Sequence, residues 1–172
     1  CSVRRQRQMC IRDSYYIESI LGDPSEEAKV VFEEDGGVKI FVGTQSNGQG
    51  HETVFAQFLS DQTGIPAAKI SVIQGDSDLI PHGGGTGGSR SVTVQNNATL
   101  ATIEKIIRSF SQYLSDKLEI DVEDIGFDDT SFRIKGSNYS PNALEVAKMA
   151  FEDNRFDLLK HSAKDTLDAL SL

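Results

Sequence analysis

The pattern of apolar and polar positions predicts a series of short strands. Residues 15–20 are aromatic and β-branched, and residues 28–32 and 38–42 flank the turn Glu34-Asp35-Gly36-Gly37. Two β-rich runs joined by a turn of this kind are typical of an antiparallel hairpin. Another β-rich run covers residues 69–74, and residues 131–135 alternate in polarity so that two apolar side chains share one face.

Helical periodicity predicts a helix after residue 53 and a long helix over residues 92–118. The first carries Val54, Phe55, Phe58 and Leu59 as an apolar stripe, and Gly64 and Pro66 are its stop signals. The predicted buried side of the second consists of Leu100, Ile103, Ile106, Ile107, Phe110 and Leu114. Each stripe indicates a helix that packs against a core.

A third helix is predicted with Ser140 as N-cap and Pro141 in the first helical position, and it continues through Phe151. From Glu152 onward the sequence is charged and weakly periodic, so no element is predicted there. The order of elements indicates a mixed α/β or α+β fold. It has a β-hairpin and short strands with three helices, and both glycine-rich loops fall at strand-to-helix junctions along one edge.

Composition limits the possible functions. The chain has 172 residues and a formal net charge of −9, which argues against a nucleic-acid-binding protein. No apolar run approaches the length that spans a bilayer. The two cysteines, Cys1 and Cys10, do not form a recognisable disulfide framework or metal site.

Both ends of the chain carry sequence that we expect to be non-native. Residues 4–14, RRQRQMCIRDS, match a translated transposon adapter from DNA sequencing libraries. The last three residues, 170–172, match the start of the reverse complement of that adapter. We therefore leave residues 1–14 out of the fold analysis. The remainder is expected to be an internal piece of a longer protein.

The glycine-rich segment at residues 83–91, GGGTGGSRS, predicts an anion-binding loop. Glycine lets a backbone approach a ligand closely, and bare N–H groups beside Ser89, Arg90 and Ser91 suit phosphate oxygens. A helix N-terminus follows and adds its dipole. The alternatives are a flexible linker for the loop and, for Arg90, an ion pair with a carboxylate such as that of Asp76 or Asp78.

The loop at residues 43–53, GTQSNGQGHET, predicts a sharp turn that exposes one amide. Gly48 and Gly50 flank Gln49 and allow that turn. His51 and Glu52 suggest a metal site, but no further ligand has suitable spacing, so none is predicted. Residues 83–88 also match the dinucleotide fingerprint G-x-G-x-x-G, although they lie well past the preceding strand and no acidic residue ends a second strand at the required distance.

The two glycine motifs together resemble a known family. GTQSNGQGHETVFAQ, followed by GIPAAKISVIQGDSDLIPHGGGTGGSRS, is similar to the molybdenum-cofactor-binding large subunit of the xanthine dehydrogenase, aldehyde oxidase and carbon monoxide dehydrogenase family, the molybdenum hydroxylases. The resemblance covers about residues 15–151 and implies part of the second molybdopterin-binding domain. Residues 152–172 form a tail without assignment.

The resemblance implies a molybdopterin cofactor, which bacterial members often carry as the cytosine dinucleotide. The residues that it places against the cofactor are Gly48, Gln49, Gly50, His51, Thr86, Gly87, Gly88, Ser89, Arg90 and Ser91. It implies no catalytic residue in this chain, because the catalytic glutamate of the family lies in a motif beyond Leu172. No metal ligand from the protein is expected.

The resemblance also implies a holoenzyme with an iron–sulfur subunit and an FAD subunit, located in the cytoplasm. Its substrate would be a small aldehyde, purine or N-heterocycle, which is hydroxylated with oxygen from water. The sequence leaves one alternative open. The chain would then be a non-catalytic phosphate- or nucleotide-binding module that uses the glycine loop for some other anion.

Overall fold

The structure is a computed structural model that describes residues 20–166. The strand predicted at residues 15–20 lies outside the described residues except for Ile20, which is not in a strand. The adapter-like residues at both ends are outside them as well.

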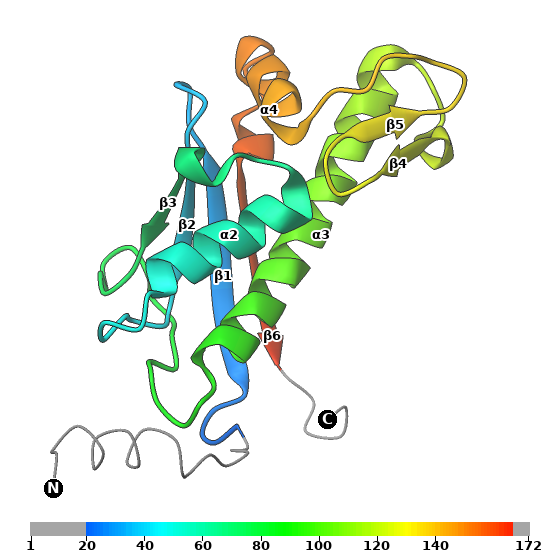
Figure 1. The fold of residues 1–172 in the computed structure, drawn as a ribbon. Helices are drawn as coiled ribbons and strands as arrows, with labels where there is room; N and C mark the ends of the chain where they lie inside the picture. Colours follow the sequence, from blue (N-terminus) through cyan, green and yellow to red (C-terminus); the bar gives the residue numbers. More distant parts are fainter. Residues whose placement is uncertain (1–19, 167–172) are drawn as a thin grey trace, which may run out of the picture.

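A four-stranded mixed sheet forms the centre of the fold (Figure 1). It consists of β1 (Ser25–Phe32), β2 (Val38–Val42), β3 (Ile70–Ile73) and β6 (Lys160–Thr166), in the order β3-β2-β1-β6. β1 pairs antiparallel with β2 and with β6, whereas β2 and β3 are parallel. The predicted hairpin is confirmed, and its first strand begins three residues earlier than expected.

Two helices lie across one face of this sheet: α2 (His51–Thr63) and α3 (Ser91–Leu118). The core between the sheet and these helices is apolar and fully enclosed. Val30, Ile40, Phe55, Leu59 and Phe110 are all 0% exposed. Burial of these side chains is the main stabilising contribution to the fold.

The predicted buried side of α3 is correct at Ile103, Ile106, Phe110 and Leu114 and wrong at Leu100, which is 37% exposed. In the first half of α3 the face against β1 carries small or polar residues instead. There Ala98 and Thr102 are 0% exposed, and the Thr102 hydroxyl donates to the carbonyl oxygen of Ala28 at 3.0 Å. The close approach of helix and strand excludes a leucine from that face.

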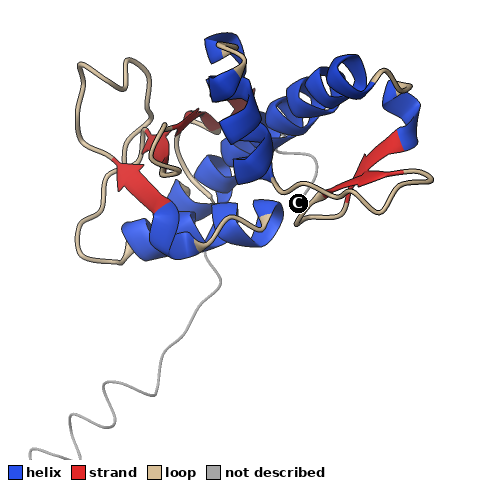
Figure 2. Cartoon of the chain, turned by 90° about the horizontal axis from the view of Figure 1, so that it is seen from above, coloured by secondary structure: helices blue, strands red, loops and turns tan. Residues whose placement is uncertain are grey.

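A smaller region packs beyond the far end of the sheet. It contains the antiparallel pair β4 (Ile125–Phe127) and β5 (Phe132–Ile134), with the helix α4 (Ala143–Glu152) nearby. Figure 2 shows this β-hairpin well separated from the central sheet. Three short 3-10 helices complete the described elements: η1 (Ala67–Lys69), η2 (Val122–Asp124) and η3 (Phe156–Leu159).

The start of α4 differs from the prediction. Asn142, not Ser140, is the N-cap, and Pro141 precedes the helix instead of opening it. The Asn142 side chain accepts from the Glu145 N–H at 3.0 Å, and the Glu145 carboxylate accepts from the Asn142 N–H at 2.8 Å. This reciprocal capping box satisfies two free backbone donors, which fixes the helix start at Ala143.

The fold places both glycine-rich loops at one edge of the sheet. Because β2 and β3 are parallel, their carboxyl ends meet at the same edge, where α/β proteins commonly bind ligands. The chain leaves β2 toward α2 and leaves β3 toward α3 at this edge (Figure 1). Within residues 20–166, no helix is both long enough and apolar enough to cross a membrane.

Candidate functional site

The candidate site is built from two segments, which we name the first glycine loop (residues 43–50) and the second glycine loop (residues 83–90). Their backbones touch at Gly43 and Gly83. A Cβ atom on Gly83 would lie 2.6 Å from the Gly43 Cα, and one on Gly43 would lie 2.5 Å from the Gly83 Cα. Both positions therefore require glycine because the loops pack against each other. The Thr86 hydroxyl adds a hydrogen bond to the carbonyl oxygen of Gln45.

A buried ion pair anchors the second glycine loop. The Arg90 Nη2 lies 2.7 Å from the Glu26 carboxylate, and the two side chains are 3% and 0% exposed. The same guanidinium donates to the carbonyl oxygens of Asp23 (2.6 Å), Gly85 (2.7 Å) and Ser25 (2.7 Å). These bonds use donors from all three guanidinium nitrogens.

This arrangement corrects one expectation from the sequence. Arg90 forms an ion pair, as the alternative proposed, but its partner is Glu26 and not Asp76 or Asp78. Both aspartates are exposed in the loop after β3. The guanidinium is directed into the protein, toward the start of β1, and is therefore not free to bind a phosphate as the sequence predicted.

A buried amide anchors the first glycine loop. Gln95 of α3 is 0% exposed; its Oε1 accepts from the Gly43 N–H at 3.2 Å and its Nε2 donates to the Glu27 carbonyl oxygen at 3.1 Å. Thr44, also 0% exposed, places its hydroxyl 3.5 Å from the Gln95 Oε1. Gln95 thus connects the first glycine loop to both the long helix and β1.

The sequence analysis did not identify Glu26, Thr44 or Gln95. A usable signal existed in β1, where Glu26 precedes Ala28, Val30 and Phe32 at two-residue spacing and so shares their inward face. A charged residue in such a series indicates a buried partner. Nothing in the sequence identified that partner, which lies 64 residues away.

The tip of the first glycine loop is open. Gly48 and Gly50 have φ values of 101° and 80°, which favour glycine, and a Cβ atom on either would meet nothing within 4 Å. Gln49 between them is exposed, as predicted. Its Oε1 accepts from the Asn47 N–H at 2.5 Å, while its NH2 group donates to no acceptor within residues 20–166.

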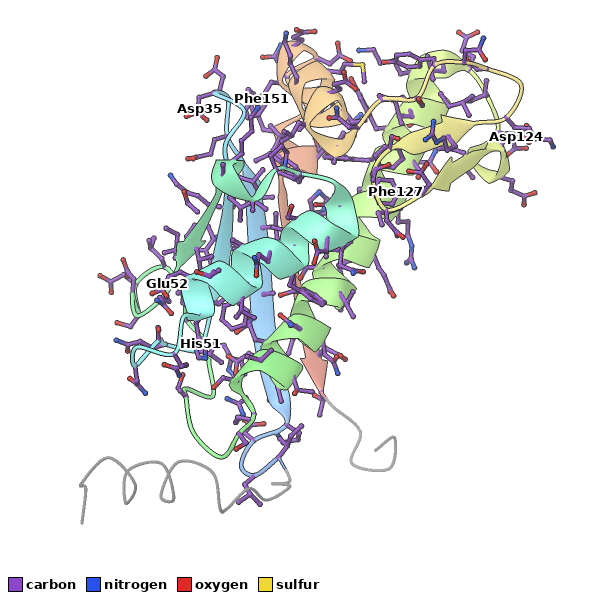
Figure 3. The ribbon with its side chains drawn as sticks, in the orientation of Figure 1. Asp35, His51, Glu52, Asp124, Phe127 and Phe151 are labelled. Carbon is purple, nitrogen blue, oxygen red and sulfur yellow. The ribbon has the colours of Figure 1, made fainter. Side chains whose placement is uncertain are left out.

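His51 is the first residue of α2 and is only 2% exposed. Its ring lies 5.1 Å from that of Phe55, and its Nδ1 is buried without a hydrogen-bond partner in the described part of the chain. Figure 3 shows His51 and Glu52 at the end of α2 that adjoins the glycine loops. The described residues contain no group of His, Cys, Asp and Glu side chains that could hold a metal ion.

The loops present unused backbone donors. Among the described residues, no acceptor is found for the N–H groups of residues 85–89 or of residues 49–52. Ser89 has a φ of 55°, a conformation that is uncommon outside glycine and that often marks functional sites. Ser91 begins α3, so the positive end of that helix dipole lies beside the second glycine loop.

Gly87 is a glycine of the second loop that packing within the described chain does not explain. Gly84 is enclosed by the protein, because a Cβ atom there would lie 2.6 Å from the Arg90 Nη2. At Gly87 a Cβ atom would meet nothing within 4 Å, and the residue has no positive φ. Packing within the described chain therefore gives no reason for a glycine at this position.

Two cavities lie at opposite ends of the molecule. The one at the glycine loops has a volume of about 290 Å³ and is lined by both loops, through Gly43 and Gly83, and by residues 75–77. A larger cavity of about 570 Å³ lies between the β1–β2 turn, the end of α2 and α4. Asp35 and Phe151 in Figure 3 mark that distant end. His51 and the N–H groups of residues 49–52 and 85–89 do not line the smaller cavity, but they lie at the same end of the molecule, so the polar groups suited to a ligand gather at that end.

Comparison with known protein families identifies this arrangement. A family model described as the molybdopterin cofactor-binding domain matches residues 4–168 of the chain. The chain belongs to this family. The resemblance inferred from the two glycine motifs is thus confirmed, and the glycine loops belong to a molybdopterin cofactor-binding domain.

Curated relatives of this domain are much longer than the chain. The large chain of carbon monoxide dehydrogenase from Afipia carboxidovorans is 37% identical over 111 residues, which cover 64% of this chain and 14% of that protein. Subunit gamma of the 6-hydroxypseudooxynicotine dehydrogenase complex from Paenarthrobacter nicotinovorans is 31% identical over 112 residues, covering 65% and 14%. The chain therefore spans a small part of these relatives.

Solved structures contain the same fold. The Cu,Mo-CO dehydrogenase in its carbon monoxide reduced state matches with a TM-score of 0.77 at 26% identity, covering 96% of this chain and 24% of that chain. Quinoline 2-oxidoreductase from Pseudomonas putida 86 matches with a TM-score of 0.65 at 24% identity, covering 83% and 19%. The predicted α+β architecture of the molybdopterin cofactor-binding domain is therefore confirmed.

Proposed function

We propose that the two glycine loops bind the molybdenum cofactor of a molybdenum hydroxylase large subunit. The observation that carries the proposal is the set of unused N–H donors at residues 85–89 and 49–52, beside glycines that the packing of the chain leaves open. Backbone donors in such loops suit phosphate and other anionic oxygens. When bound, the cofactor supplies the two-electron oxidation that hydroxylates a substrate with oxygen from water.

The residues of the site fit this group in three respects. Open space above Gly48, Gly50 and Gly87 allows a ligand to approach the backbone closely. The buried Nδ1 of His51 lacks a partner and suits a polar edge of the ligand. Two separate groups of donors suit a ligand with more than one polar end, such as a pterin joined to a dinucleotide.

We assign the contacts as follows. The second glycine loop binds phosphate oxygens through the N–H groups of Thr86, Gly87, Gly88 and Ser89, with hydroxyls from Ser89 and Ser91. The first glycine loop binds the pterin end through Gly48, Gln49, Gly50 and His51. Arg90 helps to hold the second glycine loop in place and does not bind the phosphate, because its guanidinium is paired with Glu26.

The remaining assignments concern the full-length protein. We propose that it carries the cofactor as the cytosine dinucleotide and works with iron–sulfur and FAD subunits on an aldehyde, purine or N-heterocycle. Support for a complex of several subunits comes from relatives named as the large chain of carbon monoxide dehydrogenase and as subunit gamma of the 6-hydroxypseudooxynicotine dehydrogenase complex. The catalytic base is proposed to come from another part of the large subunit.

Replacing Gly87 tests the proposal. In the full-length large subunit, Gly87→Leu places a side chain above the second glycine loop, and its Cβ atom meets nothing within 4 Å in the described chain. We expect molybdenum and pterin content to fall at least about tenfold, with thermal stability of the cofactor-free protein unchanged. The matched control is Gly126→Leu, because Gly126 is also open, without positive φ, and lies in the distant β4.

Wild-type molybdenum content in Gly87→Leu would show that the second glycine loop does not bind the cofactor. Tight binding of inorganic phosphate or free nucleotide by a protein that never acquires molybdenum would instead favour the non-catalytic anion-binding module.

A further inference from the structure

We propose that Glu26 is a positioning residue that holds both glycine loops in the arrangement that receives the cofactor. Arg90 then acts through Glu26 and not on the phosphate. The inference rests on the proposed function, because it concerns how the same site is held in shape. Glu26 itself does not contact the cofactor in this proposal.

The Glu26 carboxylate contacts both glycine loops at once. It accepts from the Arg90 Nη2 at 2.7 Å and from the Gly84 N–H, with Oε2 at 3.0 Å and Oε1 at 3.2 Å. It also lies so close to Gly43 that a Cβ atom on that glycine would overlap Oε1. One buried side chain of β1 thereby fixes the start of the first glycine loop, the second glycine loop and the residue that precedes α3.

Stability alone does not explain this pair. Apolar side chains of similar volume often stabilise a protein as well as a buried ion pair does, because both charges lose their hydration. The next residues on the same face of β1, Ala28 and Val30, are apolar and 0% exposed. The charge at position 26 occurs where this face meets the two loops, which indicates a role in their geometry.

Most glycines of the site fall into two groups around this pair; Gly88 belongs to neither, because a Cβ atom there would collide with Leu21. Gly43, Gly83 and Gly84 are enclosed, because a Cβ atom would collide with Glu26, the opposite loop or the Arg90 guanidinium. Gly48, Gly50, Gly85 and Gly87 are open, with nothing within 4 Å of a Cβ atom. The first group lets the loops close around the ion pair, and the second leaves space for a ligand.

The ion pair also determines the charge at the site. Because Glu26 neutralises Arg90, the loop attracts an anion through backbone dipoles whose orientation the pair fixes. Removing Glu26 releases a guanidinium and loosens the loop. If the phosphate is bound mainly by positive charge, the variant should bind it more tightly. If it is bound by ordered N–H groups, the variant should bind it more weakly. We expect the second result.

The test uses the full-length large subunit in its complex, with Glu26→Gln as the main variant. The amide matches the carboxylate in size but removes the negative charge that pairs with Arg90, and its NH2 group replaces one of the two oxygens that accept from the Gly84 N–H. Glu26→Asp is the second variant, which keeps the charge and shortens the reach, in case Glu26→Gln fails to fold. Glu27→Gln is the matched control, because Glu27 lies on the opposite face of β1 and is half-buried.

Two measurements are made on each variant. Hydrogen exchange in the cofactor-free form of Glu26→Gln should be about tenfold faster or more at the bonded N–H groups of Gly84 and Gly43, as expected for loss of a charged hydrogen bond. Exchange in residues 103–114 of α3 should match the wild type. Molybdenum content should fall by a similar factor, with Glu26→Asp between Glu26→Gln and the control.

Each outcome decides between the hypotheses. Unchanged exchange in the two loops, or faster exchange with full molybdenum content, would overturn the positioning role while Gly87→Leu still loses molybdenum. If neither Glu26→Gln nor Gly87→Leu changes molybdenum content, the proposed function itself is wrong. Greater cofactor retention in Glu26→Gln would mean that Arg90 binds phosphate directly once it is released.

Discussion

The two glycine loops lie against each other and are held in different ways. The base of the first glycine loop is tied by neutral amide contacts from Gln95, and its tip around Gln49 is exposed. The second glycine loop is tied by the charged pair of Glu26 and Arg90, which is almost completely buried. The difference separates residues that shape the site from residues that are free to bind a ligand.

This comparison changes what a glycine-rich motif implies. A run such as GGGTGG predicts close approach of the backbone to something, and in the second glycine loop that partner differs from residue to residue. Gly83 approaches the first loop and Gly84 the Arg90 guanidinium, whereas Gly87 approaches nothing within residues 20–166. Glycines without an internal partner are the better candidates for ligand contact.

Arg90→Ala should have the largest effect on stability. It leaves the Glu26 carboxylate buried without its cationic partner, which typically costs about 3–5 kcal/mol. The free energy of unfolding of the cofactor-free protein, measured in denaturant, should fall by that amount. Arg108→Ala, which replaces an exposed arginine of α3, is the control and should have little effect. An unchanged unfolding free energy in Arg90→Ala would mean that the pair is not formed in solution.

Gln49→Ala should behave in the opposite way. Gln49 is exposed and its one hydrogen bond in the described chain stays within its own loop, so the unfolding free energy should change by less than about 0.5 kcal/mol. Cofactor retention or activity of the full-length enzyme should fall, because the free NH2 group is assigned to the pterin end. Full molybdenum content with full turnover would remove Gln49 from the site.

The smallest effect is expected far from both loops, where Tyr113, Lys117 and Asp153 connect the end of α3 to α4. Hydrogen bonds from Lys117 at 2.6 Å and from Tyr113 at 2.5 Å lower the pKa of Asp153. A carboxyl group whose pKa is lowered in the folded state stabilises the protein above its unfolded pKa of about 3.9 and loses that contribution as the pH falls further.

Asp153→Asn should therefore remove part of the acid sensitivity without changing the cofactor site. The difference in melting temperature between wild type and variant should be present near neutral pH and shrink as the pH falls below about 4. Molybdenum content should remain at the wild-type level. A loss of cofactor in this variant would contradict the view that the two ends of the molecule act independently.

Much of the fold was predictable because strong apolar periodicity marks the β1–β2 hairpin, α2 and most of α3. β6 was not predictable: of its seven residues only Ala163 is buried, and the others are mainly lysine, serine and aspartate. That strand forms because β1 offers a free edge, with Ala28 opposite Ala163. Such pairing depends on a partner more than a hundred residues away in the sequence.

The position of the two glycine loops was predictable from the sequence, whereas the buried residues that hold them were not. The motifs place both loops at strand-to-helix junctions, which follows from local sequence. The partners of Arg90 and Gly43 are Glu26 and Gln95, which come from other elements. A polar residue on an inward face shows that a partner exists, and only the folded arrangement shows which one it is.

The most direct test of the account compares hydrogen exchange of the full-length subunit with and without its molybdenum cofactor. The account predicts slower exchange on cofactor binding at residues 85–89 and 49–52, whose N–H groups have no acceptor in the described chain. Exchange at residues 142–151, beside the larger cavity, should not change. Protection that appears beside the larger cavity and leaves both glycine loops unchanged would contradict the central claim.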